Sequence, residues 1–201
     1  MEAPELAYGV PIVSIVRDDF CVPYPVEFVV KKKNHGLFHV KYQVLDVNGK
    51  LYLQVDGFQR NMQKKRIMSD AAGFPLLTMS EKVLTPNHQW MVHRGQSSER
   101  NELLFSVQRS YTFQMRSRLN VFLPTNINED VSNFQIVECH SSQFYRIYKG
   151  ETVIAEVNYN FTWGSFCKGK ENFRVKIHPG VDYAFVMALI VILNENIIVC
   201  I

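Results

Sequence analysis

The sequence lacks the patterns of several catalytic and cofactor-binding classes. Its four cysteines, Cys21, Cys139, Cys167 and Cys200, have no C-x-x-C spacing, which suits neither a disulfide framework nor a zinc site. Neither G-x-x-x-x-G-K nor G-x-G-x-x-G occurs, so there is no nucleotide loop. Cys139 and His140 are adjacent, but neighbours on a strand point to opposite faces and cannot act as nucleophile and base. We expect no enzymatic activity, no cofactor and no bound metal.

The sequence also has little excess charge and no secretory leader. A net charge of +3 is weaker than the clustered surplus of most nucleic-acid binders, and no direct nucleic-acid motif is present. The first residues, MEAPE, carry two acids, and Pro11 and Ser14 interrupt the apolar stretch from Val10 to Val16. Free thiols are typical of a reducing compartment. We therefore expect a cytoplasmic monomer, peripheral at the plasma membrane or nuclear in part.

Alternation of apolar and polar residues with period two runs through most of the chain. In 37–46 Val40, Tyr42 and Val44 alternate with polar residues, and the hairpin signal Asn48-Gly49 follows. The pattern predicts about twelve strands, and no segment before residue 179 has helical periodicity. Their approximate bounds are 26–32, 37–46, 50–56, 63–69, 74–80, 88–94, 102–108, 112–122, 133–139, 143–149, 151–158 and 171–178. Many short strands at even spacing indicate an antiparallel barrel or sandwich.

The longest apolar run, Tyr183 to Leu193, lies near the end of the sequence. As a helix, its 11 residues span about 16 Å, roughly half of a hydrocarbon core. Extending the helix to Ile201 would reach spanning length only by including Glu195 between two asparagines, which is costly in a bilayer. We favour a buried core helix over a C-terminal membrane anchor.

A barrel of twelve strands has a lumen that this helix would fill. The predicted fold is a closed antiparallel barrel of about twelve strands around a central hydrophobic helix near 180–194, with 1–20 as an N-terminal extension and 21–201 as a single domain. Gly180 suits the N-cap of the helix, and Asp182 suits its first turn. The residues predicted to form this structural helix are Asp182, Tyr183, Phe185, Leu189, Ile190 and Leu193.

Three segments carry a family resemblance: CVPYP (21–25), HQWMVHRG (88–95) and GKENFRVKIHPGVDYAFVMALIVIL (169–193). They resemble the plant LURP-one-related family, in order, over about residues 20–194. The resemblance implies a tubby-like fold, a twelve-stranded barrel around a hydrophobic helix. The wider group includes phosphoinositide-binding tubby domains, some of them membrane-tethered transcription regulators, and phospholipid scramblases. It therefore implies a non-enzymatic, lipid-associated role in signalling or defence, with no tubby lipid-contact residue carried over.

Clusters of basic residues are the candidates for binding a phosphorylated head group. Besides Lys31-Lys32-Lys33, we single out Lys64, Lys65, Arg66, Arg116 and Arg118. Arg116 and Arg118 share one strand face, and guanidinium groups match phosphate oxygens well. The alternative is a solvated strand face whose charges discourage edge pairing. Expected partners are anionic membrane phospholipids or proteins. Two other functions stay open, a C-terminally anchored scramblase-like protein and a small-ligand-binding barrel.

Overall fold

A computed structural model of the chain describes residues 12–35, 39–60, 63–82, 89–110, 118–139, 144–159 and 170–197. The predicted site residue Arg116, His140 and Cys167 lie outside these ranges, as does most of the tail 196–201. Within them the chain forms twelve strands, two short 3-10 helices, η1 (Asp18–Phe20) and η2 (Arg100–Glu102), and the helix α2 (Tyr183–Ile197). The strands are β1 (Val26–His35), β2 (His39–Asp46), β3 (Leu51–Arg60), β4 (Gln63–Asp70), β5 (Pro75–Lys82), β6 (Gln89–Arg94), β7 (Leu103–Ser110), β8 (Arg118–Phe122), β9 (Phe134–Glu138), β10 (Phe144–Lys149), β11 (Thr152–Tyr159) and β12 (Lys170–Ile177).

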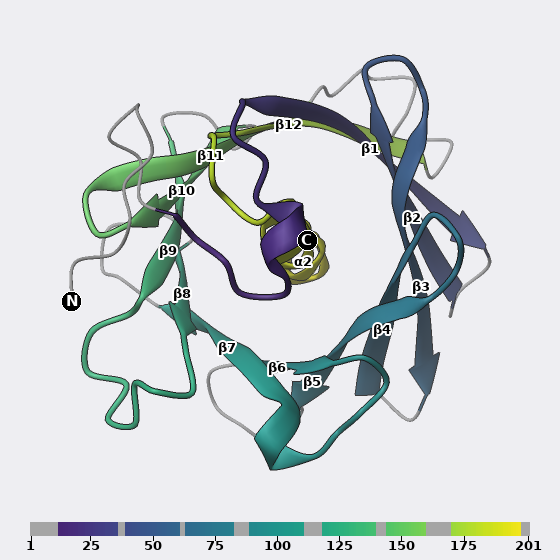
Figure 1. The fold of residues 1–201 in the computed structure, drawn as a ribbon. Helices are drawn as coiled ribbons and strands as arrows, with labels where there is room; N and C mark the ends of the chain where they lie inside the picture. Colours follow the sequence, from purple (N-terminus) through teal and green to yellow (C-terminus); the bar gives the residue numbers. More distant parts are fainter. Residues whose placement is uncertain are drawn as a thin grey trace.

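The strands form a closed barrel in sequence order (Figure 1). Each strand pairs antiparallel with the next, and β12 pairs with β1 to complete the wall, with Val26 opposite Ile177. The Asn48-Gly49 signal marks the turn between β2 and β3, where Gly49 has the positive φ of 85° that glycine adopts readily. The predicted closed antiparallel barrel is confirmed. Closure also removes the exposed edges that an open sheet would leave.

The helix α2 lies along the barrel axis (Figure 1). From Ala184 to Leu193 every side chain is at most 2% exposed, so the helix is apolar on all sides because it is enclosed on all sides. The Phe185 ring contacts Phe105 and Phe134, with ring centroids 5.0 and 4.9 Å away. The core-helix interpretation is confirmed. Of the helices in the described ranges, none has the length and apolarity that crossing a bilayer requires.

The N-terminal segment 12–22 passes over the end of the barrel where α2 begins (Figure 1). Val13 forms a parallel bridge with Val181, and Cys21 forms an antiparallel bridge with Asp182. Val13, Val16 and Phe20 are buried in the same core as the barrel and helix. Residues 12–20 of the predicted extension therefore pack on the barrel.

The cap of α2 differs from the prediction. Asp182, not Gly180, is the N-cap: its Oδ1 accepts the Phe185 N–H at 3.0 Å, and its carbonyl accepts the Val186 N–H at 3.2 Å. Gly180 has a φ of 75° and makes the turn before the helix, a conformation that other residues adopt at a cost. Glycine also has no side chain with which to cap. Asp182 therefore accepts the free N–H groups at the start of the helix, while Gly180 makes the turn that leads into it.

Candidate functional site

The barrel has two ends, and each contains the starts of alternate strands and the ends of the others. At the Asp182 end, where α2 begins, odd-numbered strands start and even-numbered strands finish. At the Glu195 end, where α2 finishes, β1 and β3 end and β2 and β4 start. Basic residues predicted to bind a head group, Lys64 to Arg66 and Arg118, occur where even-numbered strands start. The Glu195 end therefore contains the candidate site.

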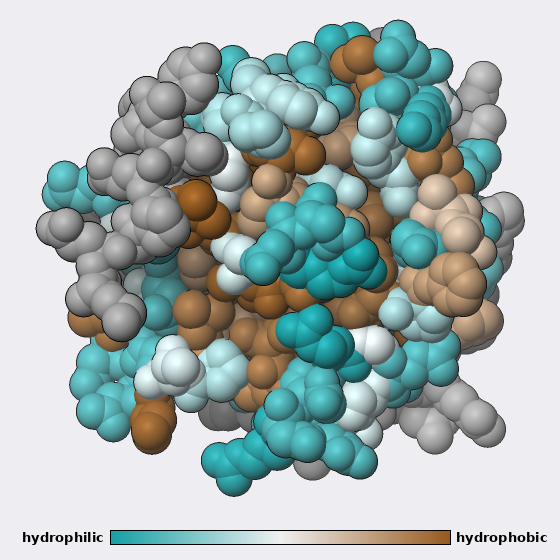
Figure 2. Space-filling model, viewed as in Figure 1, coloured by the Kyte–Doolittle hydropathy of each residue, from teal (hydrophilic) through white to brown (hydrophobic). Residues whose placement is uncertain are grey.

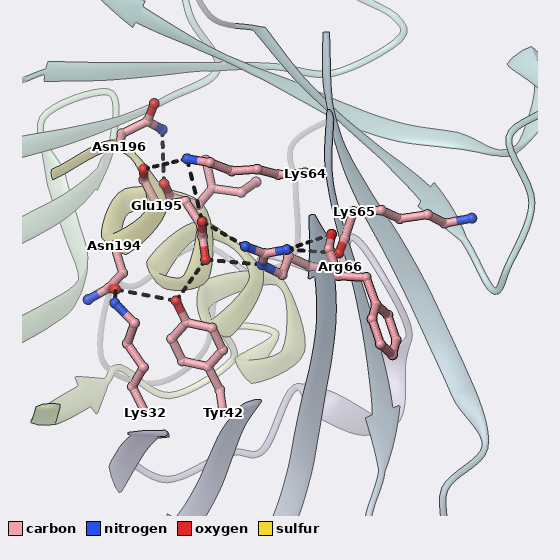
Figure 3. A network of polar contacts seen from close by, with 10 residues as sticks. Lys32, Tyr42, Lys64, Lys65, Arg66, Asn194, Glu195 and Asn196 are labelled. Carbon is pink, nitrogen blue, oxygen red and sulfur yellow. Dashed lines mark hydrogen bonds and ion pairs between the residues drawn. The ribbon is translucent and has the colours of Figure 1, made fainter. Parts of the chain in front are cut away.

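Glu195 is the centre of a buried polar cluster (Figure 3). Arg66 binds its carboxylate through two hydrogen bonds, Nε to Oε1 at 3.0 Å and Nη2 to Oε2 at 2.9 Å. This two-pronged geometry is the strongest form of an arginine–carboxylate pair. Lys64 lies beside it, with Nζ 3.6 Å from Oε2 and donating to the Glu195 carbonyl at 3.2 Å. Two cations thus contact one carboxylate at the end of the helix.

Strands β1 and β2 complete the cluster. The Tyr42 hydroxyl lies 3.1 Å from Glu195 Oε1 and 3.3 Å from Asn194 Oδ1. Lys32 Nζ donates to the same Asn194 oxygen at 2.6 Å. Lys32 and Tyr42 are at most 1% exposed. Three strands, β1, β2 and β4, are thereby tied to the last turn of α2.

Gly57 makes the inward position of Arg66 sterically feasible. Gly57 and Arg66 are paired across β3 and β4. A Cβ at residue 57 would lie 2.1 Å from Arg66 Cδ and 2.6 Å from Nε. β3 continues through this glycine to Arg60, whereas the sequence predicted an end near residue 56; glycine inside a strand often marks a close approach by another group. Gly57 is part of the site through the space that it leaves.

The charge state of Glu195 follows from two opposing effects. Burial alone would raise the pKa of its carboxyl group, but the Arg66 guanidinium, its hydrogen bonds and Lys64 together lower the pKa by more than burial raises it, so the net shift is downward. Glu195 is therefore ionised at neutral pH. The cluster is therefore a buried ionic site between the barrel strands and the central helix.

Comparisons with known proteins place the chain in a family. The model of the family described as LURP-one-related matches residues 26–194. The chain belongs to the LURP-one-related family. It is 43% identical to Protein LURP-one-related 14 of Arabidopsis thaliana, over 96% of this chain and 95% of that protein. Protein LURP-one-related 9 of the same plant is 37% identical over 92% and 98%, and Protein LURP1 is 33% identical over 90% and 88%.

The structure of this LURP-one-related protein separates the candidate head-group residues. Arg66 is buried and Lys64 half-buried, and both face Glu195. Lys65 lies between them in sequence, points to the outer face and is exposed. Arg118 begins β8, and its side chain is outside the description. The head-group role of these residues stays a prediction, now divided between an inner and an outer face.

The outer face at the Glu195 end has a basic patch that we define as Lys31, Lys33, His39, Lys41, Phe58 and Lys65. Across the strands, Lys33 is opposite Lys41, and His39 is opposite Phe58, which is opposite Lys65. Phe58 is 64% exposed and its ring stacks near His39, with centroids 4.8 Å apart. Asp56 lies 3.7 Å from Lys41 and 3.9 Å from His39. The sequence singled out Lys31, Lys33 and Lys65, but not His39, Lys41 or Phe58, and only the fold reveals the exposure of Phe58.

The Asp182 end has a different charge pattern. Its exposed acids include residues on η1, before η2 and in the loop between β8 and β9: Asp18, Asp19, Glu99, Glu129 and Asp130. Exposed bases such as Lys50, Arg100 and Lys176 are interspersed with them. Figure 2 looks onto this end and shows hydrophilic side chains over η1, with hydrophobic ones around them. Charge is thus distributed unequally along the barrel axis.

Proposed function

We propose that this protein is a non-enzymatic, tubby-like binding module that docks the Glu195 end of its barrel on anionic membrane lipid. The observation that carries the proposal is the basic patch, in which Lys65 lies opposite an exposed Phe58 and Lys33 and Lys31 extend the positive charge across β1. Each lysine near an anionic leaflet is worth about 1 kcal/mol of attraction. An exposed aromatic ring among such lysines can enter the interfacial region and add apolar burial.

Two observations support this proposal over its alternatives. The buried ionic groups Glu195, Arg66 and Lys64 pair with one another and stabilise the end of a helix, which is an ion-pair arrangement rather than a catalytic one. The helix also fills the barrel axis, which disfavours a small-ligand carrier.

The test is co-sedimentation with vesicles. Wild-type protein is mixed with phosphatidylcholine vesicles, with the same vesicles containing phosphatidylserine, and with vesicles containing a phosphoinositide. The patch variant is Lys31→Gln, Lys33→Gln, Lys65→Gln. The matched control, Lys50→Gln, Arg100→Gln, Lys176→Gln, removes the same charge from the Asp182 end. All six residues are exposed, so neither triple variant should unfold.

We expect wild type and control to bind anionic vesicles and the patch variant to lose most of that binding. Adding salt should weaken the binding because exposed charges are screened. Phe58→Ser should reduce binding while leaving its salt dependence unchanged. Equal binding by the two triple variants would refute the patch, and absence of wild-type binding to any anionic vesicle would refute the lipid function.

A further inference from the structure

The cluster around Glu195 has the chemistry of an anion site. A guanidinium, an ammonium group and a phenol converge on one carboxylate from strands β2 and β4 (Figure 3). The same donors, in the same two-pronged geometry, serve proteins that bind phosphate. What occupies the site here is an acidic side chain of the protein itself.

We propose that Glu195 is the resident occupant of an anion-binding cradle, formed by Arg66, Lys64 and Tyr42, from which a phosphate monoester group displaces it. The phosphate belongs either to a lipid head group or to a soluble molecule, since the cradle recognises the group that both share. The lipid case rests on the proposed function. Displacement releases the last turn of α2, so anion binding and the position of the C-terminal segment are coupled.

Charge matching favours phosphate over the carboxylate. Arg66 and Lys64 both lie within 4 Å of the Glu195 carboxylate, at 2.9 and 3.6 Å. A phosphate monoester carries between about −1.5 and −2 charges at neutral pH, with three acceptor oxygens. It therefore neutralises two cations more completely than a carboxylate does. Gly57 contributes by leaving the Arg66 guanidinium unobstructed from β3.

The position of Glu195 at a helix end favours its displacement, and the cradle can be reached from solvent. Glu195 is in the final turn of α2, which ends at Ile197, and helix ends open more readily than helix centres. The side chain of Lys64 is 16% exposed, whereas those of Arg66 and Glu195 are 5% exposed. Lys64 thus connects the interior to solvent, and it is adjacent in sequence to Lys65 of the outer patch. An approaching phosphate meets Lys64 before Arg66.

The experiment removes the Glu195 carboxylate from the cradle and compares how strongly different anions stabilise the variant. Melting temperatures of wild type, Glu195→Ala and Glu195→Ala with Arg66→Met are measured in sodium phosphate, sodium acetate and sodium chloride at equal ionic strength. We expect phosphate to raise the melting temperature of Glu195→Ala more than acetate or chloride does, with at least tenfold tighter apparent affinity than for wild type. The double variant should show no phosphate-specific shift.

A second measurement covers the case in which Glu195→Ala does not fold. Amide chemical shifts of wild type are followed by NMR during titration with inositol 1,4,5-trisphosphate. Saturable shifts at Gly57 and in residues 194–197 support the cradle. Shifts confined to the outer patch, or none, overturn it. In the first experiment, equal stabilisation of Glu195→Ala by acetate and phosphate, or a shift that survives Arg66→Met, also overturns it.

Vesicle binding separates this inference from the proposed function. If soluble phosphate fills the cradle of Glu195→Ala but the lysine patch variant still binds vesicles like its control, the proposed function fails and the cradle stands. If the patch variant loses vesicle binding but no phosphate enters the cradle, the function stands and the inference fails. Stronger binding of Glu195→Ala than wild type to phosphoinositide vesicles, but not to phosphatidylserine vesicles, identifies the lipid head group as the source.

Discussion

The two ends of α2 each bury a carboxylate, and they stabilise it in different ways. Asp182 is 0% exposed and accepts backbone N–H groups from Ile15 at 3.2 Å, Val16 at 2.7 Å and Arg17 at 3.2 Å, besides its cap bond to Phe185. Glu195 is 4% exposed and contacts cationic side chains and a phenol. One end uses backbone dipoles and the other uses full charges.

The helix dipole explains the difference. The start of a helix carries partial positive charge, which favours Asp182, whereas its end carries partial negative charge, which disfavours Glu195. Glu195 therefore needs cations. The pKa shifts do not follow the dipole: burial raises the pKa of Asp182 despite four backbone hydrogen bonds, while Arg66 and Lys64 overcome burial and lower the pKa of Glu195. Neutral donors fix the N-terminal segment, and charged donors form a site that another anion can compete for.

The largest expected effect comes from adding a third carboxylate between the two. Ile190→Asp places a charge in the middle of α2, at a residue 0% exposed and surrounded by apolar side chains. An unpaired buried charge costs enough to exceed the total stability of a domain, about 5–15 kcal/mol. We expect no soluble folded protein on expression, whereas Ile190→Val should fold with a loss of about 1 kcal/mol. A folded Ile190→Asp would contradict the enclosed helix.

The second effect comes from removing the cation at the Glu195 end. Arg66→Met leaves the Glu195 carboxylate buried with only Lys64 and Tyr42, and should lower the free energy of unfolding by about 3–5 kcal/mol. Arg66→Met with Glu195→Met should recover most of that loss, since a buried ion pair can be replaced by apolar side chains. Urea unfolding measures both. A double variant no more stable than the single one would mean that Arg66 acts through another contact.

A smaller effect is expected at the Asp182 end. Asp182→Ala removes the N-cap and the acceptor of three N–H groups, and should cost about 2 kcal/mol. Hydrogen exchange should accelerate at Val16, whose N–H makes the shortest of these bonds. Ser14→Ala, in the same segment and exposed, should leave both quantities nearly unchanged. Unchanged exchange at Val16 in Asp182→Ala would show that the backbone bridges to residues 181 and 182, rather than the carboxylate, hold the segment.

The smallest effect is a pH dependence of opposite sign at the two ends. The lowered pKa of Glu195 stabilises the fold above the ordinary value of 4.5, and this is lost as the pH falls through the folded-state pKa. The raised pKa of Asp182 stabilises the fold most below 3.8, and this is lost as the pH rises through the folded-state pKa.

Urea midpoints at several pH values between 3 and 7 measure these contributions. The destabilisation caused by Glu195→Gln should shrink as the pH falls, and that caused by Asp182→Asn should shrink as the pH rises. Parallel profiles for the two variants would contradict the assignment of opposite pKa shifts.

Most of the barrel could be predicted because period-two alternation reports which face of a strand is buried. The site was harder. Alternation in β4 places Arg66 and Met68 on the inner face, and it places Lys65 on the outer face. This signal was present in the sequence. The three residues instead resembled one surface cluster, because three consecutive basic residues are usually solvated. The contact between Arg66 and Glu195 joins residues 129 positions apart, which no local pattern indicates.

By itself, the amino-acid sequence determined that this chain forms about twelve antiparallel strands and one enclosed apolar helix, because strand and helix periodicities and the length of the run Tyr183–Leu193 are local properties. Only the tertiary structure decided that the Asp182 carboxylate binds the N–H groups of residues 15–17, that Gly57 leaves space for Arg66, and that the inward-facing Lys64 and Arg66 contact Glu195. Those contacts depend on how the wall closes around the helix, since closure brings together groups that are far apart in the chain.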